Sequence, residues 1–416
     1  MDKNTDLIIV GAGAAGLMAA CRAAEAGVRA VMVERKHQPG RKLLMCGNNR
    51  CNLTSAVSPE ELLAAYGEPV ASFLRPAITA LPPAQLRDWF HRRGVPTKVH
   101  KDGRVFPSSE SAADVLHCFM DQLREVDFPI LYQAPVEAVE AVRGGGFVVR
   151  TRNLTLTAPN ILIATGGVSY PKTGSVGDGQ KFATALGHAV MPFRPGLAGF
   201  DFWEPWLNPR QGEIAFPGTR LQIIVKGEPV AETAGEILCG TAGARGPALV
   251  NASRIISRRN LAKYEFLVDL APALEAAALA ERLTRLVAAA PGKPLAEILT
   301  GTFLPQEAAE PFLKTVASVD PRRRGALPAT EMAKLVKSLK EWRLEPRQMR
   351  SLKEAMVTVG GVTLKEIDPE TMQSRLRPGL YFAGEVMDVD GPSGGYNLHA
   401  AFASAALAVR SIAGKK

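Results

Sequence analysis

Three glycines near the start of the chain have the spacing of residues that bind a dinucleotide. They stand in the stretch DLIIVGAGAAGLMAA as Gly11, Gly13 and Gly16. In this pattern the first glycine permits a tight turn, the second lets the backbone approach a pyrophosphate, and the third lets a helix pack on a strand. The backbone N–H groups around Ala14 and Ala15 then point at the anion. We therefore expect these five residues to bind phosphate.

An acidic residue completes the pattern. Glu34 lies 18 residues beyond Gly16, directly after the apolar run AVMV, close to the roughly 20 residues expected for a carboxylate that binds ribose hydroxyls. The order of strand, glycine turn, helix and second strand is the βαβ unit of a dinucleotide fold. A carboxylate here repels a 2′-phosphate, so the adenosine half should belong to FAD or NAD rather than NADP.

No second glycine motif of this kind is present to hold a separate nicotinamide nucleotide. The glycines of RGGGFVVR, residues 143–150, are better explained as a hairpin turn, because the stretches on either side alternate as strands do. The sequence therefore predicts one bound dinucleotide.

The stretch GRKLLMCGNNRCNLTS, residues 40–55, holds two cysteines, three asparagines and three basic side chains. It shows neither helical nor strand periodicity, so we predict a loop. Its positive charges suit an anionic cofactor. No histidine in the stretch could activate Cys51 as a nucleophile, so a structural role is favoured over that of a redox thiol.

Two later segments also end in glycines. NILIATGGVSYPKTGSVGDG, residues 160–179, indicates an apolar strand followed by backbone that passes close to the cofactor. Residues 378–414 indicate a short strand ending at Gly384, an acidic loop, a turn at Gly394 and Gly395, and a helix from about Leu398. Backbone N–H groups after this turn could stabilise the negative charge that grows at the N1–C2=O edge of a reduced flavin. Asp388 could accept hydrogen bonds from ribitol hydroxyls.

No residue in these segments is an evident general acid or base. Tyr396, Asn397 and His399 follow the glycine turn and should lie near a flavin, but His399 falls within the predicted helix, where packing is favoured over proton transfer. We therefore name no catalytic residue.

The segments together resemble a known family. VGAGAAGLMAA, GRKLLMCGNNRCNLTS and GLYFAGEVMDVDGPSGGYNLHAAFASA resemble the bacterial BaiN-like flavoproteins, the aminoacetone-oxidase-like FAD-dependent oxidoreductases. ATGGVSYPKTGSVGDG and AMVTVGGVTLKEIDPETM are similar to that family as well, so the resemblance runs nearly end to end. It implies that FAD lies across a two-part Rossmann-type domain and that Arg41, Lys42, Arg50, Cys51 and Asn52 line the pyrophosphate and the flavin.

The chain departs from the family pattern in two places. GNNRCN stands where the family more often has GGGRCN, which puts the side chains of Asn48 and Asn49 in place of hydrogens and should narrow the flavin edge. EILCGTAGARGPALV, residues 236–250, stands where the family usually has a Thr-His pair before a Gly-x-Ser-Gly-Pro turn. A histidine on the substrate side is thus missing.

We expect FAD as the cofactor, with NADH or NADPH as a transient reductant, and no metal. The residues expected to bind FAD are Gly11, Gly13, Ala14, Ala15, Gly16, Glu34, Arg35, Arg41, Lys42, Arg50, Cys51, Asn52, Val136, Thr165, Gly166, Gly167, Gly384, Glu385, Asp388, Gly394, Gly395, Tyr396 and Asn397.

The predicted fold class is α/β, with a Rossmann-type FAD-binding domain in two parts, residues 1–190 and 355–416, and an inserted substrate domain, residues 191–354. Short alternating strands predict a β-barrel-like unit over about residues 191–270. Apolar residues three and four positions apart predict a helical unit over about residues 271–354.

The predicted function is that of a FAD-dependent oxidoreductase, in which a nicotinamide nucleotide or an organic donor reduces the flavin and a small molecule or O2 reoxidises it. Two alternatives stay open: a flavoprotein that binds or modifies RNA through its basic insert, and a non-catalytic redox sensor. The net charge of +9 and a basic run between residues 322 and 353 would suit RNA. A solvated helix face is the usual explanation of such a run, and aromatic residues are not regularly interleaved with the basic ones, so nucleic acid is the less favoured partner.

Composition limits the class of protein further. Five scattered cysteines without a CxxC pair argue against a disulfide framework or a zinc site and favour a reducing compartment. No run reaches the roughly 18 apolar residues that a membrane helix needs. We expect a soluble, cytoplasmic protein that does not bind membranes; its oligomeric state stays open.

Overall fold

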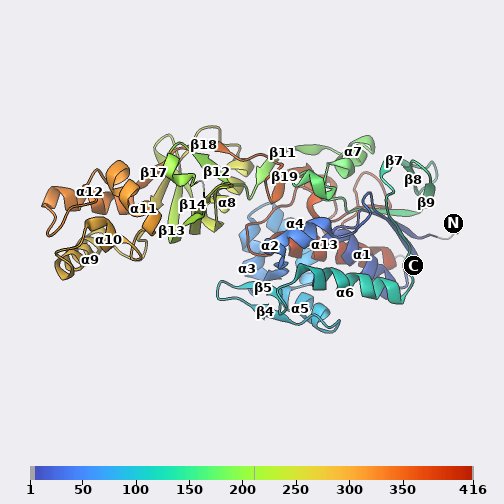
Figure 1. Ribbon diagram of the computed structural model, residues 1–416. Helices are drawn as coiled ribbons and strands as arrows, with labels where there is room; N and C mark the ends of the chain where they lie inside the picture. Colours follow the sequence, from blue (N-terminus) through green and yellow to red (C-terminus); the bar gives the residue numbers. More distant parts are fainter. Residues whose placement is uncertain (1–4, 210, 415–416) are drawn as a thin grey trace. The chain divides into compact units, whose positions relative to one another are not determined.

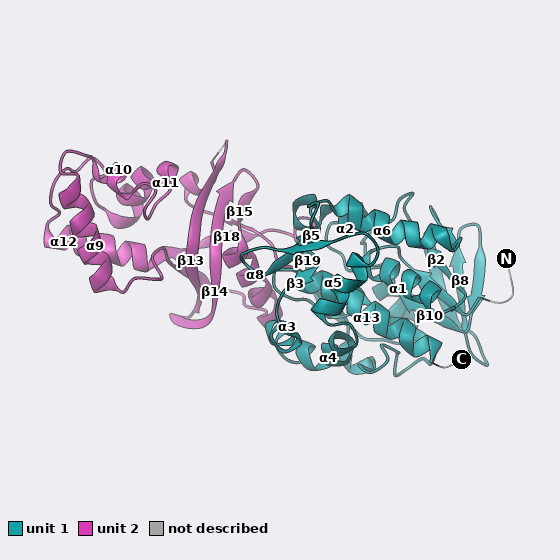
Figure 2. Ribbon diagram, turned by 90° about the horizontal axis from the view of Figure 1, so that it is seen from below, with its two compact units in different colours: residues 1–194, 356–416 teal, residues 195–355 magenta. Residues whose placement is uncertain are grey.

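The computed structural model describes residues 5–209 and 211–414, and the chain forms two compact units (Figure 1). Unit 1 comprises residues 1–194 and 356–416, and unit 2 comprises residues 195–355 (Figure 2). Each unit has its own hydrophobic core. The chain therefore leaves the first unit, builds the second, and returns.

Unit 1 is built on a parallel sheet with the strand order β20-β10-β1-β2-β6. Its strands are Leu380–Phe382, Asn160–Ile163, Leu7–Val10, Ala30–Val33 and Ile130–Leu131. Every residue of β1, β2 and β20 is buried. Such continuous apolar runs are typical of parallel sheets that are covered on both faces.

Two alanine-rich helices lie side by side in unit 1. They are α1, Ala14–Glu25, which connects β1 to β2, and α13, Tyr396–Ala413, which follows β20. A Cβ atom at Gly16 of α1 would lie 1.8 Å from the carbonyl oxygen of Gly11. Only glycine therefore permits this close packing of the helix on the preceding turn.

Several expected elements of unit 1 are confirmed. The strand within residues 160–179 is β10. RGGGFVVR holds the turn and most of the second strand of the hairpin formed by β7, Val136–Ala141, and β8, Phe147–Thr151. The final helix begins two residues earlier than expected, at Tyr396. The remaining elements are α2 Arg41–Asn49, β3 Thr54–Ser55, α3 Pro59–Tyr66, α4 Val70–Ala80, α5 Pro83–His91, β4 Thr97–Val99, β5 Arg104–Pro107, α6 Ala112–Glu125, β7 Val136–Ala141, β8 Phe147–Thr151, β9 Thr155–Ala158, α7 Asp178–Ala185, β11 Val190–Gly196 and β19 Val357–Val362.

Unit 2 contains an antiparallel sheet with the order β17-β16-β13-β14-β15-β12-β18. Its strands are Trp342–Leu344, Glu265–Asp269, Glu213–Val225, Glu228–Gly240, Gly243–Arg245, Phe200–Phe202 and Pro346–Met349. The strands at the two ends of this order, β17 and β18, are separated in the chain by Glu345 alone. The sheet must therefore curl until its edges approach each other, as in the expected barrel-like unit.

The helical part of unit 2 ends earlier than predicted. Its helices are α9 Ala276–Ala289, α10 Leu295–Leu299, α11 Gln306–Pro311, a π-helix at Phe312–Ala317, and α12 Ala329–Lys340. One further helix, α8 Pro247–Arg259, lies within residues 191–270, where strands were expected, so that prediction was wrong for this segment. The prediction of helix up to residue 354 was wrong for β17 and β18, which return to the sheet. Residues 342–344 alternate between buried and exposed positions, which is the period of a strand.

A buried carboxylate joins the strands at one edge of this sheet. Asp201 of β12, whose side chain is 9% exposed, accepts hydrogen bonds from Gln348 Nε2 at 2.7 Å and from Arg350 Nη2 at 2.7 Å. Burial raises the pKa of the Asp201 carboxyl, but the hydrogen bonds from Gln348 and Arg350 outweigh it, so the pKa lies below its ordinary value.

Asp201→Asn should lower the free energy of unfolding of unit 2 by about 2 kcal/mol at pH 7, because a charged acceptor becomes neutral. A depressed pKa stabilises the folded state above the ordinary pKa of about 4, and this contribution is lost as the pH falls further. The difference in free energy of unfolding between the parent and the variant should thus become smaller below about pH 4. Denaturant unfolding followed by tryptophan fluorescence measures it, with Glu310→Gln at an exposed position as the control. A difference that does not depend on pH would contradict the role of the charge.

Candidate functional site

The candidate site lies at the carboxyl edge of the parallel sheet of unit 1. The strands β20, β10, β1 and β2 are parallel neighbours, so all four end at the same edge. This edge is where ligands bind in open α/β sheets. Four of the segments predicted from the sequence follow these strands: the glycine loop after β1, Glu34 after β2, residues 165–167 after β10 and residues 384–385 after β20.

The glycine loop forms an open cradle. Gly11 has φ +103°, and a Cβ atom there would lie 2.7 Å from the carbonyl oxygen of Ala164. A Cβ atom at Gly13, in contrast, would have no heavy atom within 4 Å. The helix α1 begins here with neither a side-chain cap nor an acidic residue in its first turn. Its first N–H groups are thus suited to a pyrophosphate in the open space.

Glu34 is fixed at the mouth of this cradle. Its Oε2 accepts the N–H of Ala12 at 2.8 Å, and its Oε1 accepts the N–H of Lys36 at 2.7 Å. A carboxylate oxygen has two lone pairs, so each oxygen can accept one further hydrogen bond from a ribose hydroxyl. The N–H of Ala134 donates to the Glu34 carbonyl at 3.0 Å, which brings the chain just before Val136 alongside Glu34.

Two of the predicted cations are neutralised by nearby acids. Arg35 forms an ion pair with Asp178 of α7 at 2.6 Å. Lys42 Nζ lies 2.7 Å from Glu385 Oε2 and donates to Ser169 Oγ at 2.6 Å. These side chains therefore join segments of the edge to one another rather than presenting free charge.

The prediction of a loop over residues 40–55 was wrong for its first part. Residues Arg41–Asn49 form α2, which is interrupted where Cys46, Gly47 and Asn48 leave the helical region. Leu43 is 2% exposed, and α2 packs on α6. This packing on α6 stabilises the first part of α2. The regular part of the helix is too short for a helical period of apolar residues to appear in the sequence.

The departure from the GGGRCN pattern is explained by backbone conformation. Asn48 and Asn49 have φ of 56° and 63°, the left-handed region that asparagine tolerates better than most residues. Both residues are exposed. The chain thus keeps a glycine-like backbone while it directs two polar side chains into solvent.

The next three residues of this stretch have different surroundings. Cys51 is 0% exposed, and burial raises the pKa of its thiol well above the ordinary value, which agrees with a structural role. Arg50 lies over the ring of Phe106, 4.7 Å from its centroid, and 3.8 Å from Glu110. In the amide orientation that satisfies its neighbours, Asn52 accepts the N–H of Gly395 at 2.9 Å.

Arg41 has no polar partner among the described residues. Of the three basic side chains in residues 40–55, it is therefore the one whose charge is not paired within the described part of the protein.

The start of α13 is tightly packed. A Cβ atom at Gly395 would lie 2.4 Å from the carbonyl oxygen of Thr54. The first turn of the helix carries no acidic residue and no side-chain cap. Because the N–H of Gly395 is directed at Asn52, donation to a flavin would fall to the neighbouring N–H groups.

The polar side chains around this turn shape the backbone. Asn397 accepts the N–H of Gly391 at 2.8 Å and donates to its carbonyl at 2.9 Å. Asp388 accepts the N–H of Gly360 at 3.1 Å. The Tyr66 hydroxyl donates to the Tyr396 carbonyl at 2.7 Å.

His399 is 0% exposed, and its Nδ1 lies 2.9 Å from Thr54 Oγ1. Burial lowers its pKa to about 4. This environment suits packing rather than proton transfer.

Sequence reasoning missed two residues of this edge, Ser169 and Thr358. Ser169 Oγ lies 3.1 Å from Glu385 Oε1, and Thr358 Oγ1 accepts the N–H of Val168 at 2.9 Å. The similarity of ATGGVSYPKTGSVGDG and AMVTVGGVTLKEIDPETM to the family was the available signal, and it assigned no role to the serine or the threonine.

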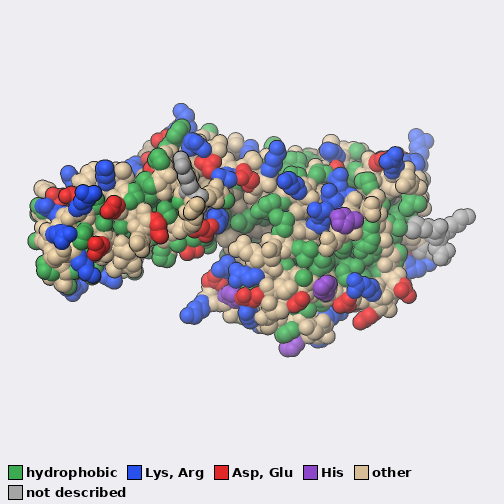
Figure 3. Space-filling view, viewed as in Figure 1, with side chains coloured by type: hydrophobic (Ala, Val, Ile, Leu, Met, Phe, Trp, Pro, Cys, Tyr) green, Lys and Arg blue, Asp and Glu red, His purple; other side chains and the backbone are tan. Residues whose placement is uncertain are grey.

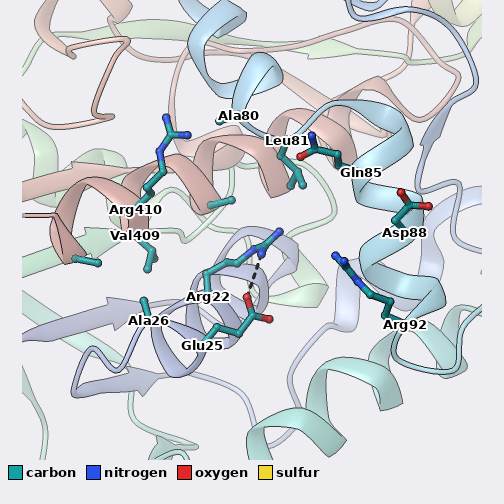
Figure 4. Close-up of a pocket in the computed structure, with 12 residues that line it drawn as sticks. Arg22, Glu25, Ala26, Ala80, Leu81, Gln85, Asp88, Arg92, Val409 and Arg410 are labelled. Atoms are coloured by element: carbon teal, nitrogen blue, oxygen red, sulfur yellow. Dashed lines mark hydrogen bonds and ion pairs between the residues drawn. The ribbon is translucent and has the colours of Figure 1, made fainter.

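A separate groove of about 520 Å³ lies elsewhere on unit 1 (Figure 4). It is lined in part by Arg22, Glu25, Arg92, Val409 and Arg410, and Arg22 forms an ion pair with Glu25 at 3.0 Å. These residues belong to the last turns of α1 and α13 or to the region of α5, whereas the glycine loop precedes the first turn of α1. The groove is therefore distinct from the candidate site.

The arrangement of unit 1 is that of a Rossmann-type FAD-dependent oxidoreductase. It combines a parallel sheet, a glycine turn after β1, an acid after β2, and a C-terminal segment that adds β20 and α13 to the same domain. The chain belongs to the family described as the HI0933-like protein Rossmann domain, which it matches over residues 5–411. The family, the fold class and the oxidoreductase function predicted from the sequence are thereby confirmed, and the reading as a non-catalytic sensor is set aside.

Two relatives cover nearly the whole chain. The ribosomal RNA dihydrouridine synthase of Escherichia coli is 30% identical over 97% of this chain and 96% of its own length. The 3-dehydro-bile acid delta(4,6)-reductase of Clostridium scindens is 29% identical over 97% of this chain and 98% of its own length. The solved structure of 3-ketosteroid delta1-dehydrogenase from Sterolibacterium denitrificans has a similar fold, with a TM-score of 0.50 at 14% identity over 99% of each chain. Among the described residues, no helix is long and apolar enough to cross a membrane.

Proposed function

We propose that the carboxyl edge of unit 1 binds FAD and that the protein reduces a C=C bond conjugated to a carbonyl group. The names of the two relatives support this reaction class. Dihydrouridine is uridine with its C5=C6 bond saturated, and a delta(4,6)-reductase acts on C=C bonds. Both names therefore describe the saturation of a C=C bond conjugated to a carbonyl group.

The observation that carries FAD binding is the meeting of four glycine-bearing or acidic strand ends at one edge. In this proposal Gly11, Gly13 and the first turn of α1 hold the pyrophosphate, and Glu34 holds the ribose. Arg41, which has no polar partner among the described residues, would interact with the anion. The other residues predicted from the sequence contribute backbone contacts or support these groups.

When bound, FAD supplies the hydride transfer that no amino-acid side chain provides. NADH or NADPH would act as a transient reductant, since the chain has a single dinucleotide motif. Unit 2 would contribute substrate contacts. We place the protein in the cytoplasm on the basis of its five free cysteines.

Anaerobic stopped-flow spectroscopy tests the proposal. The flavin of the purified protein should bleach with NADH or NADPH, and colour should return when a 3-oxo-4,6-diene steroid or a uridine-containing RNA is added. A protein that neither contains FAD nor can be reconstituted with it would refute the cofactor assignment. Reoxidation by O2 alone would refute the reaction class.

RNA as the substrate of the same reaction is a second candidate, favoured by the name of the Escherichia coli relative. The charges of unit 2 give it little support, because several of its basic residues are paired with acids. Examples of these ion pairs are Arg323 with Glu331 at 2.9 Å, Lys340 with Asp269 at 2.6 Å, Arg343 with Glu265 at 2.8 Å and Arg350 with Asp201 at 2.7 Å. On the face shown in Figure 3, basic and acidic side chains are interspersed over the α9–α12 region.

Replacing the exposed Lys334 and Lys337 by glutamine should leave flavin content and turnover of a small-molecule acceptor unchanged, because a solvated helix face contributes to neither. Lys340 is left intact because its ammonium group binds Asp269 and two backbone carbonyls. Retention on immobilised RNA over a salt series provides the second measurement. Parent protein that binds RNA, with a salt slope that falls by about one unit per lost phosphate contact in the variant, would favour the second candidate.

A further inference from the structure

The strand by which the chain returns to unit 1 lies against the candidate site. Unit 2 ends at Ala355, and β19 begins two residues later. Thr358 of this strand is 0% exposed. Its Oγ1 accepts the N–H of Val168 at 2.9 Å and that of Ser169 at 3.1 Å. Both lone pairs of the hydroxyl oxygen are therefore used by the segment that follows β10.

The contact between Thr358 and this segment is close. A Cβ atom at Gly167 would lie 2.3 Å from Thr358 Oγ1 and 3.0 Å from Glu385 Oε1. Gly166 has φ +73°, so the chain turns just before it meets the hydroxyl. The backbone of residues 166–169 is thus held by a side chain that is remote in sequence.

The same threonine connects to the segment after β20. Its backbone N–H donates to Glu385 Oε1 at 2.6 Å, and Ser169 Oγ donates to the same oxygen at 3.1 Å. Glu385 Oε2 binds Lys42 of α2 at 2.7 Å. One buried hydroxyl therefore belongs to a network that joins α2, the turn after β10, β19 and the turn after β20.

We propose that Thr358 is a positioning residue for FAD, which acts by fixing the backbone of residues 166–169 at the cofactor edge. This inference rests on the proposed function. The N–H groups of Val168 and Ser169, the first part-buried and the second buried, need an acceptor, and without the hydroxyl they must turn toward water. The glycines at 166 and 167 permit that movement, which takes this backbone out of the geometry that receives the cofactor.

Thr358→Val removes the hydroxyl and keeps the shape, whereas Thr358→Ser keeps the hydroxyl. We expect the dissociation constant of FAD, titrated into the apoprotein, to rise by about tenfold or more in the valine variant, and to stay within about threefold of the parent in the serine variant. Thr157→Val, at an exposed position of β9, is the matched control and should bind FAD as the parent does. The flavin absorption spectrum of the valine variant should also shift.

The outcomes separate this inference from the proposed function. A parent protein that binds no FAD refutes the proposed function itself. A parent that binds FAD, with a valine variant of equal affinity and spectrum, overturns the inference alone, even if the melting temperature of the variant falls. If the valine variant does not fold, amide hydrogen exchange of the parent tests the proposal instead. The backbone N–H groups of Val168 and Ser169 should be protected from exchange in the apoprotein, and more strongly protected with FAD. Exchange as fast as in an open loop would overturn the proposal.

Discussion

Replacing Glu34 by arginine should weaken FAD binding by about 100-fold or more. Loss of two hydrogen bonds to a charged acceptor corresponds to about 3 kcal/mol, which is about two decades in the dissociation constant. The same change leaves the N–H groups of Ala12 and Lys36 without their acceptor, because a guanidinium group has no lone pair to offer. The glycine loop and the ribose contact should thus be lost together.

Equilibrium titration of the apoprotein with FAD measures this effect. Glu125→Arg makes the same charge change at an exposed position at the end of α6, and it should leave the dissociation constant unchanged. Glu34→Gln keeps one acceptor oxygen and should have an intermediate effect. An arginine variant with the affinity of the parent would remove Glu34 from the site.

The second large effect is expected at Gly395, where valine should destabilise unit 1 by about 3 kcal/mol. Its φ of +97° is a conformation in which a residue with a Cβ atom is strained, by about 1–2 kcal/mol. Its Cβ atom would also lie 2.4 Å from the Thr54 carbonyl oxygen, and such overpacking costs about 1–3 kcal/mol more. The start of α13 must then move away from β3.

The same movement should lower the midpoint potential of bound flavin, because N–H donors at the start of α13 favour the reduced, negatively charged form. Loss of one such hydrogen bond, about 1.4 kcal/mol, corresponds to about 30 mV for a two-electron couple. Thermal unfolding and potentiometric titration measure the two effects, with Gly414→Val as the control, since a Cβ atom at Gly414 would meet nothing closer than 3.5 Å. A valine variant with the stability of the parent would contradict the close packing of Gly395 on Thr54. A variant that binds FAD with the potential of the parent would show that α13 does not begin against the flavin.

The cofactor edge could be predicted because its chemistry is local. The glycines at 11, 13 and 16 are required by backbone conformation and close approach, and Glu34 follows its strand at the distance that one βαβ unit dictates. The strands at residues 160–163 and 380–382 were predictable in the same way, because the glycines that follow each apolar run indicate where the strand ends. Each of these features depends on residues within one βαβ unit or one strand, and it can therefore be recognised from the sequence alone.

The pairing of charges could not be predicted because it depends on residues far apart in the chain. Lys42 appears in the sequence as a free cation beside an anionic cofactor, yet it binds Glu385, 343 residues away. Arg35 is neutralised in the same way by Asp178, 143 residues away. No local period records a partner at such a separation.

By itself the sequence determined a βαβ dinucleotide site, the family, and an insert between two parts of one domain. Only the tertiary structure decided that residues 41–49 form an interrupted helix, that residues 342–344 and 346–349 are strands, and that Thr358 holds the turn after β10. The physical reason is the same in each case. The helix at residues 41–49 is stabilised by burial against α6, and the strands β17 and β18 by pairing with the edges of the sheet. Thr358 supplies an acceptor for N–H groups of a distant turn. Each of these interactions forms only after segments far apart in the chain have come together.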